Sequence, residues 1–372
     1  MKNEPVIMNC INKIPTYERV KYQQGDEFYI RVNFNYLKPN NPRELILRKG
    51  ELLIIRDTMY GGTIGSWSGV KISLSCEPGE SGVVPNKARA EQLALKFKAE
   101  EQKNKEMKRR LRPRRQSMLN TRSEYQSQDK LDSTSFNEEM IQIPAYQKVV
   151  KKIADFKRPV ILIGDASDLY RDYLKTQLPY EFDYAVSKNN DYKKSDKNLS
   201  VKLYNIRKII SSGKHCLLDI SCEGIEMLHH INIAPIVILI RLVDKKMANE
   251  FRTAVVNMVY GRNQDCIDKK ESRRINKYGL NFYKKHSTYL NAIVEILDQP
   301  VDQVYIELLD IIRARQNDEI FVSADEQIDE NIINSFILKE TNYSSGISSN
   351  SESCTEDEES LYSRNGDDKV FK

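Results

Sequence analysis

Short apolar segments separated by turn residues dominate the first quarter of the chain. After the long run Phe28–Tyr36, these segments are Leu45–Leu47, Leu52–Ile55, Trp67–Ile72 and Gly82–Pro85, with glycine-containing turns among them. Several short strands at this spacing are typical of a small all-β barrel. The pattern therefore predicts a barrel at the start of the folded part of the chain.

A helical pattern follows the barrel. Asn86 is suited to cap a helix, and the residues from Lys87 to Leu111 favour helix formation until Pro113 ends the pattern. The first part of this helix has apolar residues at helical spacing, whereas the second part is basic and has almost none. Residues 116–138 are rich in Ser, Gln, Asn and Asp and predict a flexible linker.

Beyond Ile141 the pattern alternates between strand-like and helix-like segments. The predicted strands are residues 159–163, 216–220, 235–240 and 292–296, and the predicted helices are residues 168–176, 201–212, a segment from Ile225, 245–287 and 301–315. Strands that alternate with helices imply a parallel sheet with both faces covered. One isolated strand, Ile320–Ser323, follows the last helix.

Charge is distributed unevenly along the chain. The 372 residues carry a formal net charge of +5, but residues 96–115 hold ten Lys/Arg against three Glu, and residues 323–372 hold twelve Asp/Glu against four Lys/Arg. Blocks of like charge usually mark solvated segments or interaction tails. We call residues 96–115 the basic hook, and we expect the acidic, serine-rich residues 325–372 to be a disordered tail.

The cysteine and histidine positions predict no metal site and no cofactor. The six cysteines are scattered, no pair forms Cys-x-x-Cys, and the four histidines show no metal-binding spacing. Reduced thiols in a cytosolic protein are the simplest interpretation. No apolar run approaches the roughly 18 residues of a membrane-spanning helix.

One segment has the outline of a phosphate-binding loop. An apolar strand pattern ends at Gly164 and helix-compatible residues follow, which is the context of the G-x-x-x-x-G-K-[ST] loop. Counted from this glycine, the second glycine, the lysine and the hydroxyl residue are replaced by Leu169, Tyr170 and Arg171. The loop therefore lacks the ammonium group and the metal-binding hydroxyl.

Two carboxylates also stand in this loop. Asp165 and Asp168 would repel a polyphosphate, each by roughly 1 kcal/mol at a partly solvated site. The sequence therefore predicts a fold of the nucleotide-binding type that lacks the groups needed to bind and transfer phosphate.

Four strings of the sequence carry a family resemblance. They are Gly25–Arg31, Gly82–Leu93, Pro144–Val150 and Lys214–Asp219. In this order they resemble the SH3–guanylate-kinase-like core of the membrane-associated guanylate kinase scaffolds, and more narrowly the zonula occludens branch at tight junctions. The resemblance covers about residues 20–325. The PDZ modules that precede this core in the family are missing, which predicts a fragment or a truncated product.

The resemblance implies a multidomain chain, with an all-β SH3-like barrel, an α/β guanylate-kinase-like domain of the P-loop type and a disordered acidic tail. The expected division is 1–25 N-terminal extension, 26–95 SH3 domain, 96–140 basic hook and linker, 141–150 SH3 strand, 156–318 guanylate-kinase-like domain, 319–324 final SH3 strand and 325–372 tail.

SH3 domains usually bind proline-rich peptides between surface aromatics. The family's Ala-Leu-Tyr-Asp-Tyr motif reads Val32–Tyr36 here, and its tandem Trp-Trp reads Ser66-Trp67. We expect Trp67 to pack inward and this peptide binding to be lost.

The resemblance also places the GMP-reading segment of active kinases at Phe182–Asn190, which keeps no arginine. The later Asp-x-Asp-x-x-Gly pattern keeps only Asp219 and Gly224. Phosphoryl transfer depends on positioning and charge compensation, so we expect no enzyme activity.

In this family the last SH3 strand arrives only after the kinase-like domain. Ile141–Val150 and Ile320–Ser323 flank that domain, and each is a short apolar strand whose backbone needs a partner. We predict that they pair and join the two domains into one unit. The residues expected to couple the domains are Tyr146, Val149, Phe321 and Val322.

The basic hook carries chemistry only as a field of positive charge. Nucleic-acid interfaces also need stacking aromatics or a groove-reading element, and only Phe97 lies nearby, so we expect no nucleic-acid partner. An acidic membrane surface is an open secondary contact. The favoured ligand is an acidic cytoplasmic segment. The hook residues expected to bind it are Lys103, Lys105, Lys108, Arg109, Arg110, Arg112, Arg114 and Arg115.

By resemblance, the acidic partner would be the tail of a tight-junction membrane protein such as occludin. The family also implies actin-linked adaptors as partners, a dimer as one assembly, and a place on the cytoplasmic face of the plasma membrane at tight or septate-type cell–cell junctions.

Two features are suited to regulate the hook. The acidic tail is a tethered competitor at high effective concentration, so we hypothesise autoinhibition by residues 325–372. Arg114-Arg115-Gln116-Ser117 fits a basophilic kinase site, and phosphate on Ser117 would subtract about 1.5 to 2 charges from the hook.

The sequence favours a non-enzymatic scaffold that links junctional membrane proteins to cytoskeletal and signalling partners. Two alternatives stay open: a residual nucleotide-binding guanylate kinase or sensor, and an adaptor like the calcium-channel β subunit, which shares the two-domain layout. The string Val83–Leu93 favours the junctional branch over the second alternative.

Overall fold

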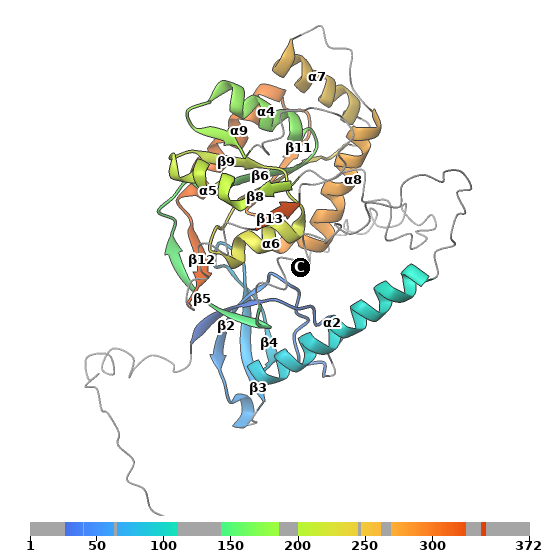
Figure 1. Cartoon of the computed structure of the whole chain (residues 1–372), viewed down its shortest axis with the longest axis vertical. Coiled ribbons are helices and arrows are strands. Elements are labelled where there is room, and N and C mark those ends of the chain that lie inside the picture. Colours follow the sequence, from blue (N-terminus) through green and yellow to red (C-terminus); the bar gives the residue numbers. More distant parts are fainter. Residues whose placement is uncertain are drawn as a thin grey trace, which may run out of the picture.

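A barrel-like sheet and a larger α/β domain make up the computed structural model of this chain (Figure 1). The structure describes residues 27–39, 41–62, 65–110, 143–185, 200–244, 247–261, 269–324 and 336–339.

The barrel is an antiparallel six-stranded sheet with the spatial order β12-β5-β1-β2-β3-β4. Apolar side chains fill its interior, and Val32, Leu53 and Val84 are fully buried there. A short 3-10 turn, η1 (Tyr60–Gly62), joins β2 to β3. The strands are β1 Phe28–Val32, β2 Leu52–Asp57, β3 Ser66–Ile72, β4 Pro78–Pro85, β5 Tyr146–Ile153 and β12 Glu319–Ser323.

Two strands of this sheet come from either side of the α/β domain. β5 precedes that domain and β12 follows it, and the two pair antiparallel with Phe321 opposite Lys151 and Val322 opposite Val150. The pairing predicted for the two flanking segments is therefore present, although β5 begins at Tyr146 and continues to Ile153.

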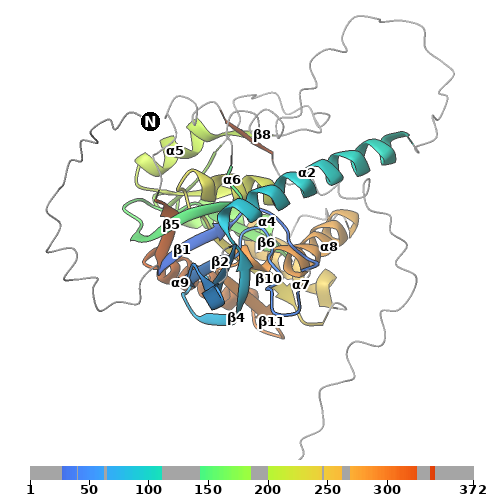
Figure 2. The ribbon, with the colours of Figure 1, turned by 90° about the horizontal axis from the view of Figure 1, so that it is seen from below.

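A single helix, α2 (Lys87–Arg110), leaves the end of β4. The Asn86 side chain accepts a hydrogen bond from the backbone N–H of Arg89 at 2.9 Å, which confirms its capping role. Ala90 is buried in the barrel core, and Phe97 packs on its edge. Beyond these contacts, the helix projects away from the barrel in both views (Figures 1 and 2).

The α/β domain is built on a parallel five-stranded sheet with the order β11-β10-β6-β9-β7. Side chains of the central strand β6 alternate: Val160 and Leu162 face one side, and Ile161 and Ile163 face the other. The strands are β6 Val160–Gly164, β7 Phe182–Tyr184, β9 His215–Leu218, β10 Ile236–Leu242 and β11 Ala292–Ile296.

Helices cover both faces of this sheet, as the alternating pattern predicted. α4, α7 and α9 pack on one face, and α5, α6 and α8 pack on the other. Their bounds are α4 Ser167–Gln177, α5 Leu203–Ser211, α6 Cys222–His230, α7 Ala248–Tyr260, α8 Lys269–His286 and α9 Val301–Gln316, with the 3-10 turn η3 Ser287–Tyr289 after α8.

The prediction of a disordered tail from residue 325 was wrong for residues 336–339. Residues Ile337–Lys339 form β13, which pairs antiparallel with β8 (Ser200–Lys202). Phe336 and Leu338 are buried in the core of the α/β domain. Three consecutive apolar residues inside an acidic segment bury enough surface to fix this strand. The predicted helix over 201–212 accordingly begins only at Leu203.

Two other expectations were wrong in detail. Residues 45–47 form no strand: Leu47 makes an isolated bridge to Tyr36, and the apolar pattern there reflects burial of the leucines. The helix predicted over 245–287 is two helices, because Gly261 ends α7 with φ of 82°, a conformation that favours glycine.

Among the helices in the described ranges, none has the length and apolar composition that crossing a membrane requires.

Candidate functional site

Gly164 ends β6 at the position where a phosphate loop would begin, with φ of 98°. A Cβ atom there would overlap the backbone oxygen of Ile240. Helix α8 also passes close by, since a Cβ atom on Gly279 would lie 2.8 Å from the Gly164 Cα. The glycine is therefore required by the close approach of β10 and α8.

The two carboxylates of the loop are bound to the protein itself. Asp165 accepts a hydrogen bond from the backbone N–H of Leu242 at 2.8 Å. Asp168, in the first turn of α4, accepts two from the guanidinium of Arg252 on α7, at 2.9 and 2.6 Å. The Arg252 guanidinium neutralises the Asp168 carboxylate, and the Leu242 N–H satisfies an oxygen of Asp165, so both acids are bound by the protein itself.

The residues at the other loop positions point inward. Leu169 and Tyr170 are buried in the core beneath α4, and the Tyr170 hydroxyl donates to the backbone oxygen of Val301 at 3.1 Å. Arg171 is buried and pairs with Asp219 at 2.6 Å. The retained aspartate of the Asp-x-Asp pattern is thus held by the residue that replaces the loop's hydroxyl.

The segment expected to read GMP is partly described. Lys175 pairs with Asp183, and the hydroxyls of Tyr184 and Tyr260 each donate to Asp172 at 2.6 Å. Burial, together with the hydrogen bond to Asp172, raises the pKa of Tyr184. Residues 186–190 of this segment lie outside the described residues. The polar groups seen here pair with each other.

The aromatic motif of the barrel is covered by α2. Phe34 and Tyr36 are buried, and the Tyr36 hydroxyl donates to Glu44 at 2.6 Å, which also pairs with Arg89 of α2 at 2.8 Å. Trp67 packs on the barrel core, as expected. The aromatics that would line a proline-peptide groove are therefore part of the core.

A buried arginine joins the barrel to the α/β domain. Arg31 on β1 donates to the backbone oxygens of His229 at 3.0 Å and Phe321 at 2.8 Å, and to the side chain of Gln147 at 3.3 Å. Burial lowers the pKa of Arg31 to about 10. One side chain thus connects β1, β5, β12 and the end of α6.

Further contacts lie at the same boundary between the barrel and the α/β domain, which we call the seam. Lys49 of the barrel pairs with Glu226 on α6 at 2.5 Å. The neighbouring Gly50 has φ of 90°, and a Cβ atom there would overlap the ring of Tyr289. On β12, the backbone N–H of Ser323 donates to the Asn232 side chain at 2.7 Å. The barrel and the α/β domain are packed directly against each other.

The predicted coupling residues occupy two places. Val149 and Phe321 are buried together with Leu52 in a small cluster beside the β5–β12 pair, and Val322 is half-buried. Tyr146 lies instead in the barrel core, opposite Val32 on β1. Burial raises the pKa of its phenol.

The basic hook is described only in part. Lys103 is exposed on the projecting half of α2, and Met107 near it is 59% exposed. Lys105, Lys108, Arg109 and Arg110 belong to the same helix, but their side chains lie outside the described residues. Arg112, Arg114, Arg115 and Ser117 also lie outside them, so their binding roles stay predictions.

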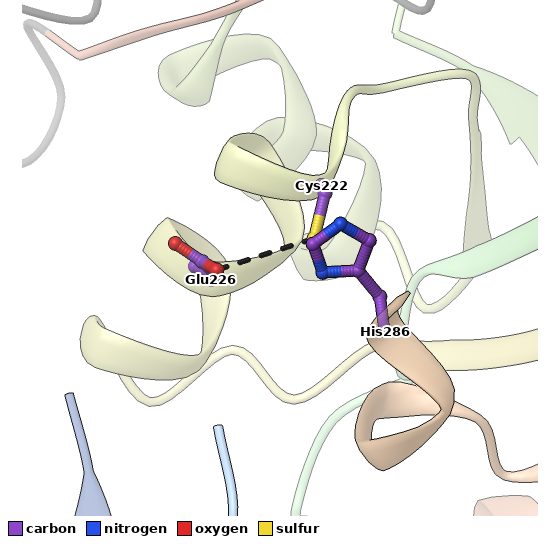
Figure 3. Close-up of side chains that lie close together, drawn as sticks. All are labelled: Cys222, Glu226 and His286. Atoms are coloured by element: carbon purple, nitrogen blue, oxygen red, sulfur yellow. Dashed lines mark hydrogen bonds between the residues drawn. The ribbon is translucent and has the colours of Figure 1, made fainter. Parts of the chain in front are cut away.

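The fold also brings together three groups that the sequence analysis did not connect: Cys222, Glu226 and His286 (Figure 3). The signal available in the sequence was the Cys-x-x-x-Glu spacing, but His286 is distant in the chain. Burial and the charges of Glu226 and Glu223 raise the pKa of the Cys222 thiol. This is the opposite of what a nucleophilic cysteine needs.

Comparison with known proteins gives the following relatives. No protein-family model matches the chain. Rat tight junction protein ZO-1 is 29% identical over 330 residues, which are 87% of this chain and 18% of that protein. Human tight junction protein 2 is 30% identical over 300 residues, 81% of this chain and 24% of that protein.

The chain is a relative of the zonula occludens tight-junction proteins. The family resemblance inferred from the sequence is thereby confirmed. The chain spans about a fifth of the length of these curated relatives.

The crystal structure of the SH3–kinase fragment of tight junction protein 3 shares the fold. It aligns with 80% of this chain and 100% of that chain, with a TM-score of 0.53 and 24% identity. This confirms the predicted fold class, an SH3-like barrel joined to a guanylate-kinase-like domain.

Proposed function

We propose that the chain is a non-enzymatic scaffold unit that docks acidic cytoplasmic segments of junctional membrane proteins. The observation that carries this proposal is the phosphate loop, in which Asp165, Asp168 and Arg171 all bind groups of the protein itself. Phosphoryl transfer depends on side chains that position the phosphate and compensate its charge. These three side chains of the loop are already bound within the protein.

The seam between the two domains supports a role as a platform. Buried contacts from Arg31, the Lys49–Glu226 pair and the β5–β12 pairing hold the barrel against the kinase-like domain. A surface that spans both domains therefore keeps its shape when a partner binds, which reduces the entropic cost of association.

The hook supplies the charge for an acidic ligand. Helix α2 is anchored to the barrel by its first half, and the side chains described in its second half, Lys103 among them, are exposed to solvent. Positive charge on a projecting helix steers acidic partners and makes their binding dependent on salt. Because the relatives carry tight-junction names, we infer a place on the cytoplasmic face of the plasma membrane at cell–cell junctions, with tails like that of occludin as ligands.

The acidic tail competes for the hook in this scheme. β13 fixes residues 336–339 on the kinase-like domain, so the acidic residues beyond Lys339 are tethered to the folded unit. Tethering at high effective concentration favours an intramolecular contact over a free ligand. Phosphate on Ser117 would weaken both contacts by removing positive charge.

Calorimetry with GMP and with ATP–Mg²⁺ tests the non-enzymatic part of the proposal. We expect no binding tighter than about 100 μM, or roughly −5.5 kcal/mol. Tighter binding of either nucleotide would favour a residual kinase or sensor. For the docking part, the tagged chain should accumulate at cell contacts, and reversing the hook charges should disperse it; accumulation that survives the reversal argues against the hook.

A further inference from the structure

Three side chains of kinds that bind transition metals converge beside the seam (Figure 3). Cys222 and Glu226 lie one helical turn apart on α6, and His286 ends α8. Their ligand atoms all lie within 4.8 Å of one another, and the Cys222 sulfur lies 4.0 Å from a carboxylate oxygen of Glu226. We propose that these three residues form a binding site for one divalent transition-metal ion, for which zinc is the best fit.

The chemistry of the three groups selects the ion. A thiolate, an imidazole and a carboxylate are the sulfur, nitrogen and oxygen ligands that zinc takes, whereas calcium and magnesium take oxygen ligands. In tetrahedral zinc sites with Zn–S and Zn–N bonds of about 2.3 and 2.0 Å, neighbouring ligand atoms lie about 3.5 Å apart. The Cys222–Glu226 separation of 4.0 Å is somewhat wider than this, and rotations of these side chains and of the half-exposed His286 ring are the movements that bring the three ligand atoms around one ion.

The surroundings already orient the carboxylate. Lys49 contacts one oxygen of Glu226 at 2.5 Å, while the other oxygen faces Cys222. Outer partners of this kind fix the direction of a metal-binding carboxylate. The side chain of Glu226 is only 11% exposed, so a cation there is partly shielded from water.

One neighbouring charge favours a cation and another opposes it. Glu223 acts electrostatically on both Cys222 and His286, and its negative charge attracts a metal ion. The Lys49 ammonium repels it. Removing that ammonium should therefore tighten metal binding, which a purely structural role of the cluster does not predict.

A bound ion would join α6 to α8 at the place where the barrel loop holding Lys49 meets the kinase-like domain. Anything that binds only the folded state stabilises it in proportion to the logarithm of its concentration above the dissociation constant. The site would thus make the stability of the kinase-like domain, at the place where it contacts the barrel, depend on zinc. This goes beyond the proposed scaffold role and is independent of whether the hook binds an acidic tail.

Cobalt and zinc titrations of the full chain, first stripped with a chelator, test the proposal. We expect one cobalt ion per chain with a near-ultraviolet thiolate-to-cobalt absorption band, and zinc should displace it and raise the unfolding midpoint. Cys222→Ser should abolish the band and weaken zinc binding at least a hundredfold. His286→Gln, at a half-exposed position that is safer for folding, should weaken it at least tenfold. Lys49→Met should tighten it at least threefold.

Cys76→Ser is the matched control, because Cys76 is a half-buried free thiol outside the cluster; it should leave both titrations unchanged. Circular dichroism of each metal-free variant verifies its fold. The proposal is overturned if wild-type protein gives no thiolate band, if the band survives Cys222→Ser, or if the folded His286→Gln variant binds zinc as tightly as wild type.

Discussion

The guanidinium of Arg31 donates a hydrogen bond to the backbone oxygen of Phe321, 2.8 Å away, across 290 residues of sequence. The bond ties the first strand of the barrel to its last, and the whole kinase-like domain lies between them in the chain. The same guanidinium also bonds to the end of α6. The two domains therefore cannot separate without unpairing the buried backbone oxygen of His229.

Replacing Arg31 with Met should therefore destabilise the protein by about 3 kcal/mol, since two buried backbone oxygens lose their donor. Chemical denaturation of the full chain measures this change. Arg56→Met is the control, because Arg56 is exposed on the adjacent strand β2, and its effect should stay within about 0.5 kcal/mol. A stabilising Arg31→Met, as occurs when some buried charges are replaced by apolar residues, would contradict the role given to this arginine.

Replacing Gly164 and Gly213 by alanine separates two reasons for a glycine: a positive φ and a lack of space for a Cβ atom. Both have positive φ, but a Cβ atom at Gly164 overlaps the backbone of β10, whereas the space around Gly213 is open. Gly213→Ala should cost about 1 kcal/mol for backbone strain alone. Gly164→Ala should cost at least about 3 kcal/mol in equilibrium unfolding, because strand or helix backbone must shift. If the two substitutions cost the same, the close approach of β10 is not the reason for a glycine at position 164.

His230 should make stability depend on pH. Burial and the charges of Arg31 and Lys49 lower its pKa to about 3, whereas the unfolded chain has a histidine pKa of about 6.5. The unfolded state therefore binds the extra proton as pH falls below 6.5, and stability is lost from there down toward pH 3. Between pH 7 and 5 this one group should cost about 2 kcal/mol. His230→Asn should reduce the measured loss by that amount; an unchanged pH profile would count against it.

The hypothesis that the acidic tail inhibits the basic hook is tested by a deletion that leaves β13 in place. Removing residues 340–372 keeps Phe336 and Leu338 in the core and removes eight Asp/Glu and three Lys/Arg. Binding of an acidic peptide should then tighten severalfold at low salt and change little at high salt, because the competing charge is gone. Fluorescence anisotropy at the two salt concentrations measures this. Unchanged affinity at low salt would remove the autoinhibition hypothesis.

Local patterns predicted much of the fold because burial imposes them directly. The run from Pro235 to Ile240 predicted a strand covered on both faces, and Ile236–Ile240 is buried throughout. The family resemblance predicted the barrel and the late strand Ile320–Ser323, which the structure shows as Glu319–Ser323. Residues 336–339 were missed since three apolar residues in an acidic segment give no period long enough to detect.

The candidate sites were harder to predict because they depend on contacts between distant residues. The sequence showed that the phosphate loop lacks its lysine, but not that Asp168 would be neutralised by Arg252. Sequence spacing also could not predict that His286 lies close to Cys222, since the two residues are on different helices. Arg31, which joins the domains, has no sequence pattern that sets it apart from an exposed arginine.

Titration of an acidic cytoplasmic-tail peptide into the full chain tests the central claim most directly. The hook variant carries Lys103→Glu, Lys105→Glu and Lys108→Glu, and the control reverses three exposed lysines elsewhere: Lys38, Lys208 and Lys284. The scaffold account predicts at least tenfold weaker binding by the hook variant, or about 1.4 kcal/mol, with the control within twofold of wild type. Equal affinity of the hook variant and wild type at low salt would contradict it.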